Sequence, residues 1–169
     1  AVAEGMNLQD TLATIRAHHP ELSAQENGAL QDIAYGCQRY LGSLKHMLGQ
    51  MLNKPIDNAE LESLLLAALY QLHYTQNAPH AVVNEAVESI AKIGRGQYRS
   101  FANAILRRFL RERDKLVNSC KKSDVAKYNL PLWWVAYLQN HYPKHWQNIA
   151  AALQSHPAMT LLVNCRKED

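Results

Sequence analysis

The chain has 169 residues, of which 47% are hydrophobic, 20% charged and 8% aromatic, and its formal net charge at pH 7 is +3. These fractions are typical of globular domains and exclude a disordered or collagen-like chain. No stretch approaches the roughly 18 uncharged apolar residues that a membrane-spanning helix needs.

Apolar residues recur at spacings of three and four along most of the chain, which predicts an all-α protein. A first helix is predicted over about residues 2–18. It should end there because the residue before a proline, here His19 before Pro20, is disfavoured in helical conformation. A second begins at Ser23, since Ser23-x-x-Glu26 has the spacing of a capping box. Its apolar stripe runs to about residue 52, and we expect a bend or break near Gly42.

The rest of the chain is predicted to form three more long helices and two short ones, followed by one strand. The helices are expected over about residues 57–77, 79–93, 97–117, 131–141 and 143–155. The sequence Gly94-Arg95-Gly96 separates the fourth helix from the fifth, because glycine is the residue that most easily turns left-handed after a helix. Residues 159–163 predict a short β-strand, which is not stable alone and belongs to a following domain.

Charge is unevenly distributed. Residues 92–122 hold ten Lys and Arg against two Asp and Glu, whereas residues 1–91 hold four against ten. A solvated surface normally mixes the two signs, so this concentration predicts a polyanionic partner, with nucleic acid as the first candidate. A basic surface helix without a ligand is the alternative.

The predicted fifth helix carries most of these cations. At 100° per residue its apolar side chains, from Phe101 to Leu116, fall on one half of the circumference, and its cations fall on the other half. Two further arginines near its start oppose the helix dipole, so they have no role in stabilising the helix. Because arginine pairs with phosphate in a bidentate manner, we predict contacts to an RNA or DNA backbone. The predicted RNA-binding residues are Arg95, Arg99, Arg107, Arg108, Arg111 and Lys115.

No catalytic, cofactor-binding or metal site is predicted in this chain. His141 and His145 have helical spacing, but Pro143 between them interrupts a helix. Cys37, Cys120 and Cys165 are too far apart for a disulfide framework, and the start of the chain lacks a secretory pattern, so we expect a cytoplasmic protein. Cys37 is expected in the core. Cys120 is expected to be an ordinary surface thiol, a lowered pKa beside two lysines being the alternative.

Aromatic residues are the other candidate contacts to a nucleic acid. Trp133, Trp134 and Trp146 lie on the two short helices. Such tryptophans more often anchor a helix to a core, and stacking on bases is the alternative.

Three motifs together resemble the signature of the NusB-like helical fold. They are LYQLxY from Leu69, APHAVVNEAVE from Ala78 and FANAILRR from Phe101. Their order and spacing match over about residues 1–120. The resemblance implies a NusB-like bundle of about five to seven helices, in which the second and third motifs lie on helices that pack together.

Beyond residue 120 the chain resembles the Sun/Fmu type (RsmB) of 16S ribosomal RNA cytosine-C5 methyltransferases. The similar segments are LPLWW from Leu130, YPKHW from Tyr142 and MTLLVN from Met159, although Leu162 stands where the family usually has arginine. The resemblance implies a NusB-like RNA-binding domain over residues 1–128, a helical linker over 129–157 and the start of a methyltransferase region over 158–169.

Enzymes of that family use S-adenosylmethionine and a cysteine thiolate, with a glycine-rich loop and Pro-Cys and Thr-Cys motifs that this chain lacks. The resemblance therefore implies a protein that is an enzyme when whole, of which this chain is a non-catalytic part that positions 16S ribosomal RNA. Its implied partners are that RNA and its own C-terminal methyltransferase domain. A free NusB-like antitermination factor, and an interaction module that docks on the catalytic domain, are the two alternatives. The oligomeric state stays open.

Overall fold

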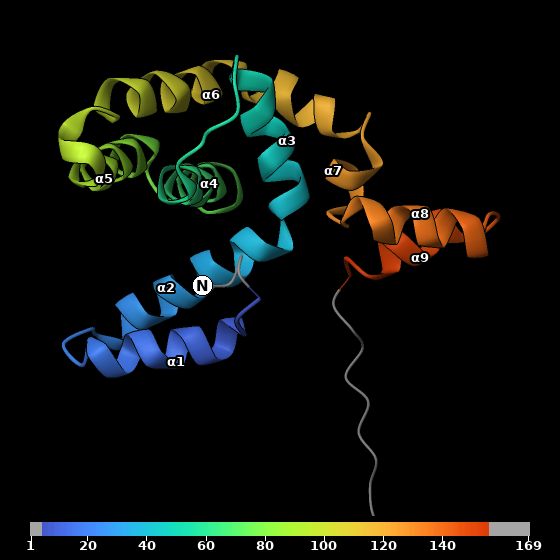
Figure 1. Cartoon of the computed structure of the whole chain (residues 1–169), viewed down its shortest axis with the longest axis horizontal. Helices are drawn as coiled ribbons and strands as arrows, with labels where there is room; N and C mark the ends of the chain where they lie inside the picture. The colour runs from blue at the N-terminus through green and yellow to red at the C-terminus, as the bar shows by residue number, and fades with distance from the viewer. Residues whose placement is uncertain (1–4, 156–169) are drawn as a thin grey trace, which may run out of the picture.

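A computed structural model describes residues 5–155 of the chain, and Figure 1 shows their arrangement. The elements are α1 (Leu8–His18), α2 (Ala24–Arg39), α3 (Leu41–Met51), α4 (Ala59–Tyr74), α5 (Pro79–Lys92), a short 3-10 helix (Ile93–Gly96), α6 (Arg99–Cys120), α7 (Asp124–Tyr128), α8 (Leu132–His141) and α9 (Trp146–Ala152). The described residues contain helices and no strands, which confirms the all-α prediction. None of these helices combines the length and the apolar character needed to cross a membrane.

Local capping signals explain where the first helices begin. Asn7 caps α1 by accepting a hydrogen bond from the Gln9 amide at 2.8 Å, so this helix starts at Leu8 and not near residue 2 as predicted. The capping box of Ser23 and Glu26 is present and confirms the predicted start of the second helix. The predicted break in that helix is also confirmed and lies at Tyr40, where α2 ends and α3 begins.

The third long helix begins slightly later than the predicted residue 57. Asn58 caps α4, and its side chain accepts a hydrogen bond from the Leu61 amide at 2.8 Å. The helix α7 was not predicted, because its five residues are too few to show a periodic pattern. The strand predicted over residues 159–163 lies outside the described residues.

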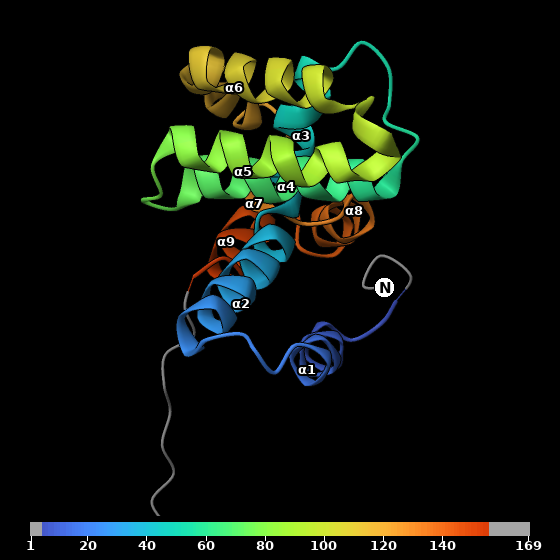
Figure 2. The same cartoon turned by 90° about the vertical axis from the view of Figure 1, so that its left-hand side faces the viewer.

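The main core forms where α3, α4, α5 and α6 meet. Figure 1 shows α4 in the middle of these helices, and Figure 2 shows α5 lying along α4 with α6 above them. Five apolar residues of α4, α5 and α6 at this junction are at most 8% exposed: Leu65, Leu69, Val87, Ile105 and Phe109. The apolar side of α6 therefore faces inward, and its opposite side points outward.

A second, smaller core lies between α7, α8 and α9. Tyr128, Leu138 and Ala150 form its buried centre, and Trp134 and Trp146 pack against it. These two tryptophans therefore anchor their helices, as predicted. Trp133 does not, because 68% of its surface is exposed.

Close approach of α2 to α4 depends on one glycine. A Cβ atom at Gly36 would overlap the Tyr70 ring, which lies directly against this turn of α2. The Tyr70 hydroxyl donates to both carboxylate oxygens of Asp32 at 3.2 Å. Burial first, and then the charge of Asp32, raises the pKa of Tyr70 to about 12, so this hydroxyl remains a donor at neutral pH.

The first prediction concerns the main core. Because Phe109 is fully buried, Phe109→Ala is expected to lower the free energy of unfolding by about 3–5 kcal/mol. Urea unfolding followed by circular dichroism measures the loss. A loss below about 1 kcal/mol would contradict the assignment of this face of α6 to the core.

The second prediction compares two glycines of α2. Gly36→Ala is expected to destabilise the fold by about 1–3 kcal/mol, because the Tyr70 ring has to move and its bond to Asp32 is lost. Gly28→Ala is the matched control, since a Cβ atom there meets nothing within 4 Å. Alanine at that position is expected to stabilise the helix by about 0.5–1 kcal/mol. Equal effects of the two substitutions in thermal unfolding would contradict this packing.

Candidate nucleic-acid interface

The turn between α5 and α6 has three successive residues in left-handed backbone conformation. The φ angles of Gly94, Arg95 and Gly96 are 60°, 55° and 87°. The positive φ angle at Gly94 favours glycine, and a Cβ atom there would also lie 2.6 Å from the Gln97 side-chain nitrogen. The predicted stop at these residues is confirmed. The tight turn places α6 antiparallel to α5 and leaves Arg95 exposed beside the start of α6.

The face of α6 opposite the core carries three exposed cations. Arg107, Arg111 and Lys115 lie at intervals of four residues, so their side chains follow each other along one line of the helix. The Arg107 guanidinium donates to the side chain of Asn103 at 2.9 Å. Within residues 5–155, none of these three cations has an ion-pair partner. We call Arg107, Arg111 and Lys115 the basic line.

The other two predicted residues on α6 have partners inside the fold. Arg99 forms an ion pair with Glu88 of α5, and both side chains are more than half exposed. Arg108 is half-buried and donates to the carbonyl of Met51 at 3.1 Å and to Glu112 at 3.0 Å. Met51 is the last residue of α3, so Arg108 satisfies a carbonyl that the end of this helix leaves without a partner. The structure therefore separates Arg108 from the basic line.

A hollow of about 330 Å³ lies between α5 and α6 beside this line. His80, Val83 and Asn84 of α5 line it from one side, and Arg107, Leu110 and Arg111 of α6 line it from the other. The guanidinium groups and the amide could bind the phosphates and the bases of a single strand. His80 was missed in the sequence, although its spacing of four residues from Asn84 places both on one face of α5.

Arg113 was not predicted as a site residue, and it acts within the fold. It donates to the ring nitrogen Nδ1 and to the backbone carbonyl of His73, at 3.2 and 3.1 Å. Burial first, and then the charge of Arg113, lowers the pKa of His73, so a neutral imidazole accepts this bond. His73 lies in the last turn of α4, and Arg113 therefore holds the end of that helix against α6.

The cysteines offer no reactive site. Cys120 is only 8% exposed, so the prediction of a surface thiol is wrong. Its burial raises the pKa of the thiol, which also contradicts the alternative of a lowered pKa. Cys37 is half-buried against the main core, and burial raises its pKa to about 11. No group of three or more potential metal ligands occurs among the residues that the structure describes.

Comparison with known proteins places these elements in two family models. The model of the NusB family matches residues 2–111. The model described as Methyltr_RsmF/B-like, ferredoxin-like domain matches residues 130–169. The boundary between the matched ranges falls close to α7, which connects the two hydrophobic cores.

Curated relatives match nearly the whole chain. It is 33% identical over 158 residues to the ribosomal RNA small subunit methyltransferase B of Pectobacterium carotovorum, covering 92% of this chain and 37% of that protein. The proteins of the same name from Escherichia coli and Salmonella arizonae are 33% and 32% identical over 165 residues, which is 96% of this chain and 38% of each relative. The chain thus spans less than two fifths of the length of these relatives.

The third prediction distinguishes the two kinds of arginine on α6. Arg108→Ala is expected to lower the free energy of unfolding by about 1–2 kcal/mol, because the Met51 carbonyl loses its partner. Arg107→Ala removes an exposed side chain and is expected to change stability by less than about 0.5 kcal/mol. Chemical denaturation of both variants measures the difference. If Arg108→Ala left the free energy of unfolding unchanged, Arg108 would have no structural role and would belong with the basic line.

Proposed function

The chain belongs to the NusB family, and on that premise we propose that it is the RNA-binding amino-terminal part of a 16S ribosomal RNA (cytosine-C5) methyltransferase. The observation that carries the proposal is the similarity of nearly the whole chain to proteins named ribosomal RNA small subunit methyltransferase B, together with the basic line. In this proposal residues 1–128 bind RNA, residues 129–157 connect, and residues 158–169 begin the following region.

The proposed division of labour assigns the chemistry to the rest of the protein. The methyl donor S-adenosylmethionine and the catalytic cysteine belong to the C-terminal methyltransferase domain, and this chain supplies neither. Its role is to hold ribosomal RNA so that the target cytosine reaches that domain. Cytosine-C5 chemistry on a folded RNA requires such positioning, because the reacting base has to be presented unstacked to the active site.

Phosphate contact is the proposed role of the basic line. Arg107 and Arg111 are exposed, lie on the same side of α6 and border the hollow between α5 and α6. Arg95 extends the positive surface at the start of this helix, and Lys115 extends it towards the end. Arg99 can also contact phosphate once its exposed ion pair with Glu88 opens, since an exposed ion pair contributes little free energy of stabilisation. Arg108 contributes its charge from a half-buried position.

The two alternatives differ in what they explain. A free antitermination factor leaves unexplained why residues 130–169 match a domain of RNA methyltransferases. Docking of the basic line on the catalytic domain is the second candidate, because the same line would suit an acidic protein surface. The relatives continue well beyond the length of this chain, so such a surface is available to them.

The fourth prediction tests the basic line. If four to six cations contact single-stranded RNA, the logarithm of the affinity should fall with the logarithm of salt concentration with a slope of about −3 to −4. The double variant Arg107→Glu and Arg111→Glu should weaken binding to all RNA sequences and flatten the slope by about 1.4. Folding should survive, because both side chains are exposed. Fluorescence anisotropy with labelled RNA over a salt series measures both quantities.

The matched control reverses two exposed lysines in the region of the second core, Lys127→Glu and Lys144→Glu. It changes the net charge equally and should leave the slope nearly unchanged. The same double variants are then measured in the protein extended to the length of its relatives. Unchanged RNA affinity of the Arg107 and Arg111 variant in the longer protein would favour docking on the catalytic domain.

A further inference from the structure

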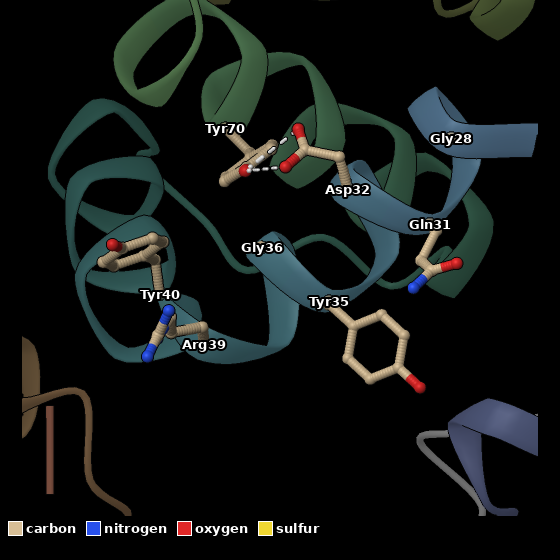
Figure 3. A pocket seen from close by; sticks show the side chains of 8 residues that line it. All are labelled: Gly28, Gln31, Asp32, Tyr35, Gly36, Arg39, Tyr40 and Tyr70. Atoms are coloured by element: carbon tan, nitrogen blue, oxygen red, sulfur yellow. Dashed lines mark hydrogen bonds between the residues drawn. The ribbon is translucent and has the colours of Figure 1, made fainter. Parts of the chain in front are cut away.

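A hollow beside α2 lies on the opposite side of α4 from the basic line. It has a volume of about 680 Å³, within the range of small-molecule sites. Figure 3 shows its lining, with Asp32 and Tyr70 on one side, Arg39 and Tyr40 at one end and Tyr35 on the far side. Figure 2 shows α2 below α4 and α6 above it, so this hollow is separate from the proposed phosphate contacts.

Gly28 leaves part of this hollow open. Glycine inside a helix is unfavourable, and Gly36 has a packing reason that Gly28 lacks, since nothing lies within 4 Å of a Cβ atom built there. The Asp32 carboxylate is turned towards the Tyr70 hydroxyl, and the Tyr35 ring lies on the far side of the hollow (Figure 3). The absence of a side chain at Gly28 therefore leaves its part of the lining open.

The side chains around this space offer three complementary contacts. Asp32 is exposed and already accepts from Tyr70, and each of its oxygens retains a further lone pair for a ligand. Tyr35 has 44% of its surface exposed, so its ring face is accessible to a ligand. Arg39 is exposed and has no ion-pair partner within residues 5–155.

The neighbouring groups hold this arrangement in place. Gln31 accepts a hydrogen bond from Arg16 of α1 at 2.8 Å, which fixes one wall. Tyr40 stacks on Tyr74 with ring centroids 3.9 Å apart, which fixes the other. Six of the eight lining residues lie on α2, and Tyr40 at its end and Tyr70 of α4 complete the lining.

We propose that this hollow binds an unpaired guanine nucleotide, with the base edge on Asp32, the base face on Tyr35 and the phosphate on Arg39. Guanine alone among the four RNA bases has two adjacent N–H donors on its Watson–Crick edge, N1–H and the N2 amino group, and these match the two oxygens of a carboxylate. Adenine and cytosine present an acceptor beside their amino group, and uracil presents one donor between two acceptors. A carboxylate repels those acceptors.

This inference deepens the proposed function and rests on it for the source of the nucleotide, an unpaired guanosine in ribosomal RNA. Phosphate contacts along α6 position an RNA without specifying its sequence. A guanine site on α2 would add the sequence information that the basic line cannot supply. It would also fix the register of the RNA with respect to the following domain.

The experiment titrates the full chain with the free nucleotides GMP, IMP, AMP, CMP and UMP, following the ring resonances of Tyr35 by NMR. IMP is the sharpest comparison, because it lacks only the N2 amino group. GMP is expected to bind at least about fivefold more tightly than IMP, as one good bidentate contact discriminates by roughly that factor or more. Equal affinities for GMP and IMP, or resonance changes with an arginine-rich peptide and none with GMP, would overturn the proposal.

Variants separate the site from the stability of the fold. Gly28→Leu fills the hollow and should weaken GMP binding more than tenfold, while the thermal midpoint does not fall, because leucine is a better helix former than glycine. Gly28→Ala is the control and should bind GMP within about threefold of the natural chain. Asp32→Asn keeps an acceptor for Tyr70 and should abolish the preference for GMP over IMP. Natural GMP affinity in Gly28→Leu would also overturn the proposal.

The same titration separates this inference from the proposed function. The Arg107→Glu and Arg111→Glu variant should retain its affinity for GMP even where it loses RNA. Binding of GMP by a chain that does not bind RNA would refute the proposed function and leave the guanine site standing. Binding of RNA by a chain that shows no preference for GMP would refute the guanine site and leave the proposed function standing.

Discussion

The arrangement of this molecule depends on the burial of α4. Seven of its residues are buried, and they face several directions around the helix axis, so α4 has to be covered on more than one side. Four helices pack on it, with α2 on one side, α3 alongside, and α5 and α6 on the other. Both candidate sites follow from this constraint. They lie on the outward surfaces of the helices that cover α4, and α4 itself keeps them apart.

Coverage of α4 leaves each outer helix with a different surface. Helix α6 turns Leu106 and Phe109 inward, so its cations have to point to solvent. Helix α2 approaches α4 through Gly36, where the Tyr70 ring replaces a side chain of α2. This close approach brings the Tyr70 hydroxyl to Asp32 and leaves a carboxylate held beside an open space. One helix thus presents a charged line, whereas the other presents a shaped hollow.

Local patterns in the sequence predict most of the fold. The capping box at Ser23 and the stop at Gly94 act between near neighbours, and the periodicity that places Phe109 inside acts along one helix. Cys120 was assigned to the surface because adjacent lysines dominate its local sequence. Its burial instead results from packing against α3, where the Ser43 carbonyl lies 3.9 Å from its sulfur. The helix was expected to end near residue 117, whereas α6 continues to Cys120 and places it one turn after the buried Leu116.

The candidate sites show the same division between local and distant information. Spacing along α6 identifies five of the six predicted cations, but it cannot show that Arg108 reaches Met51, which is 57 residues away in the chain. The hollow beside α2 depends on Asp32 meeting Tyr70 across 38 residues, so no motif indicates it. A helical wheel therefore finds cations that point away from the core of their own helix, and only the fold shows which of them have a partner on another helix. Arg107, Arg111 and Lys115 have no ion-pair partner among the described residues, so their charges remain available to a polyanion.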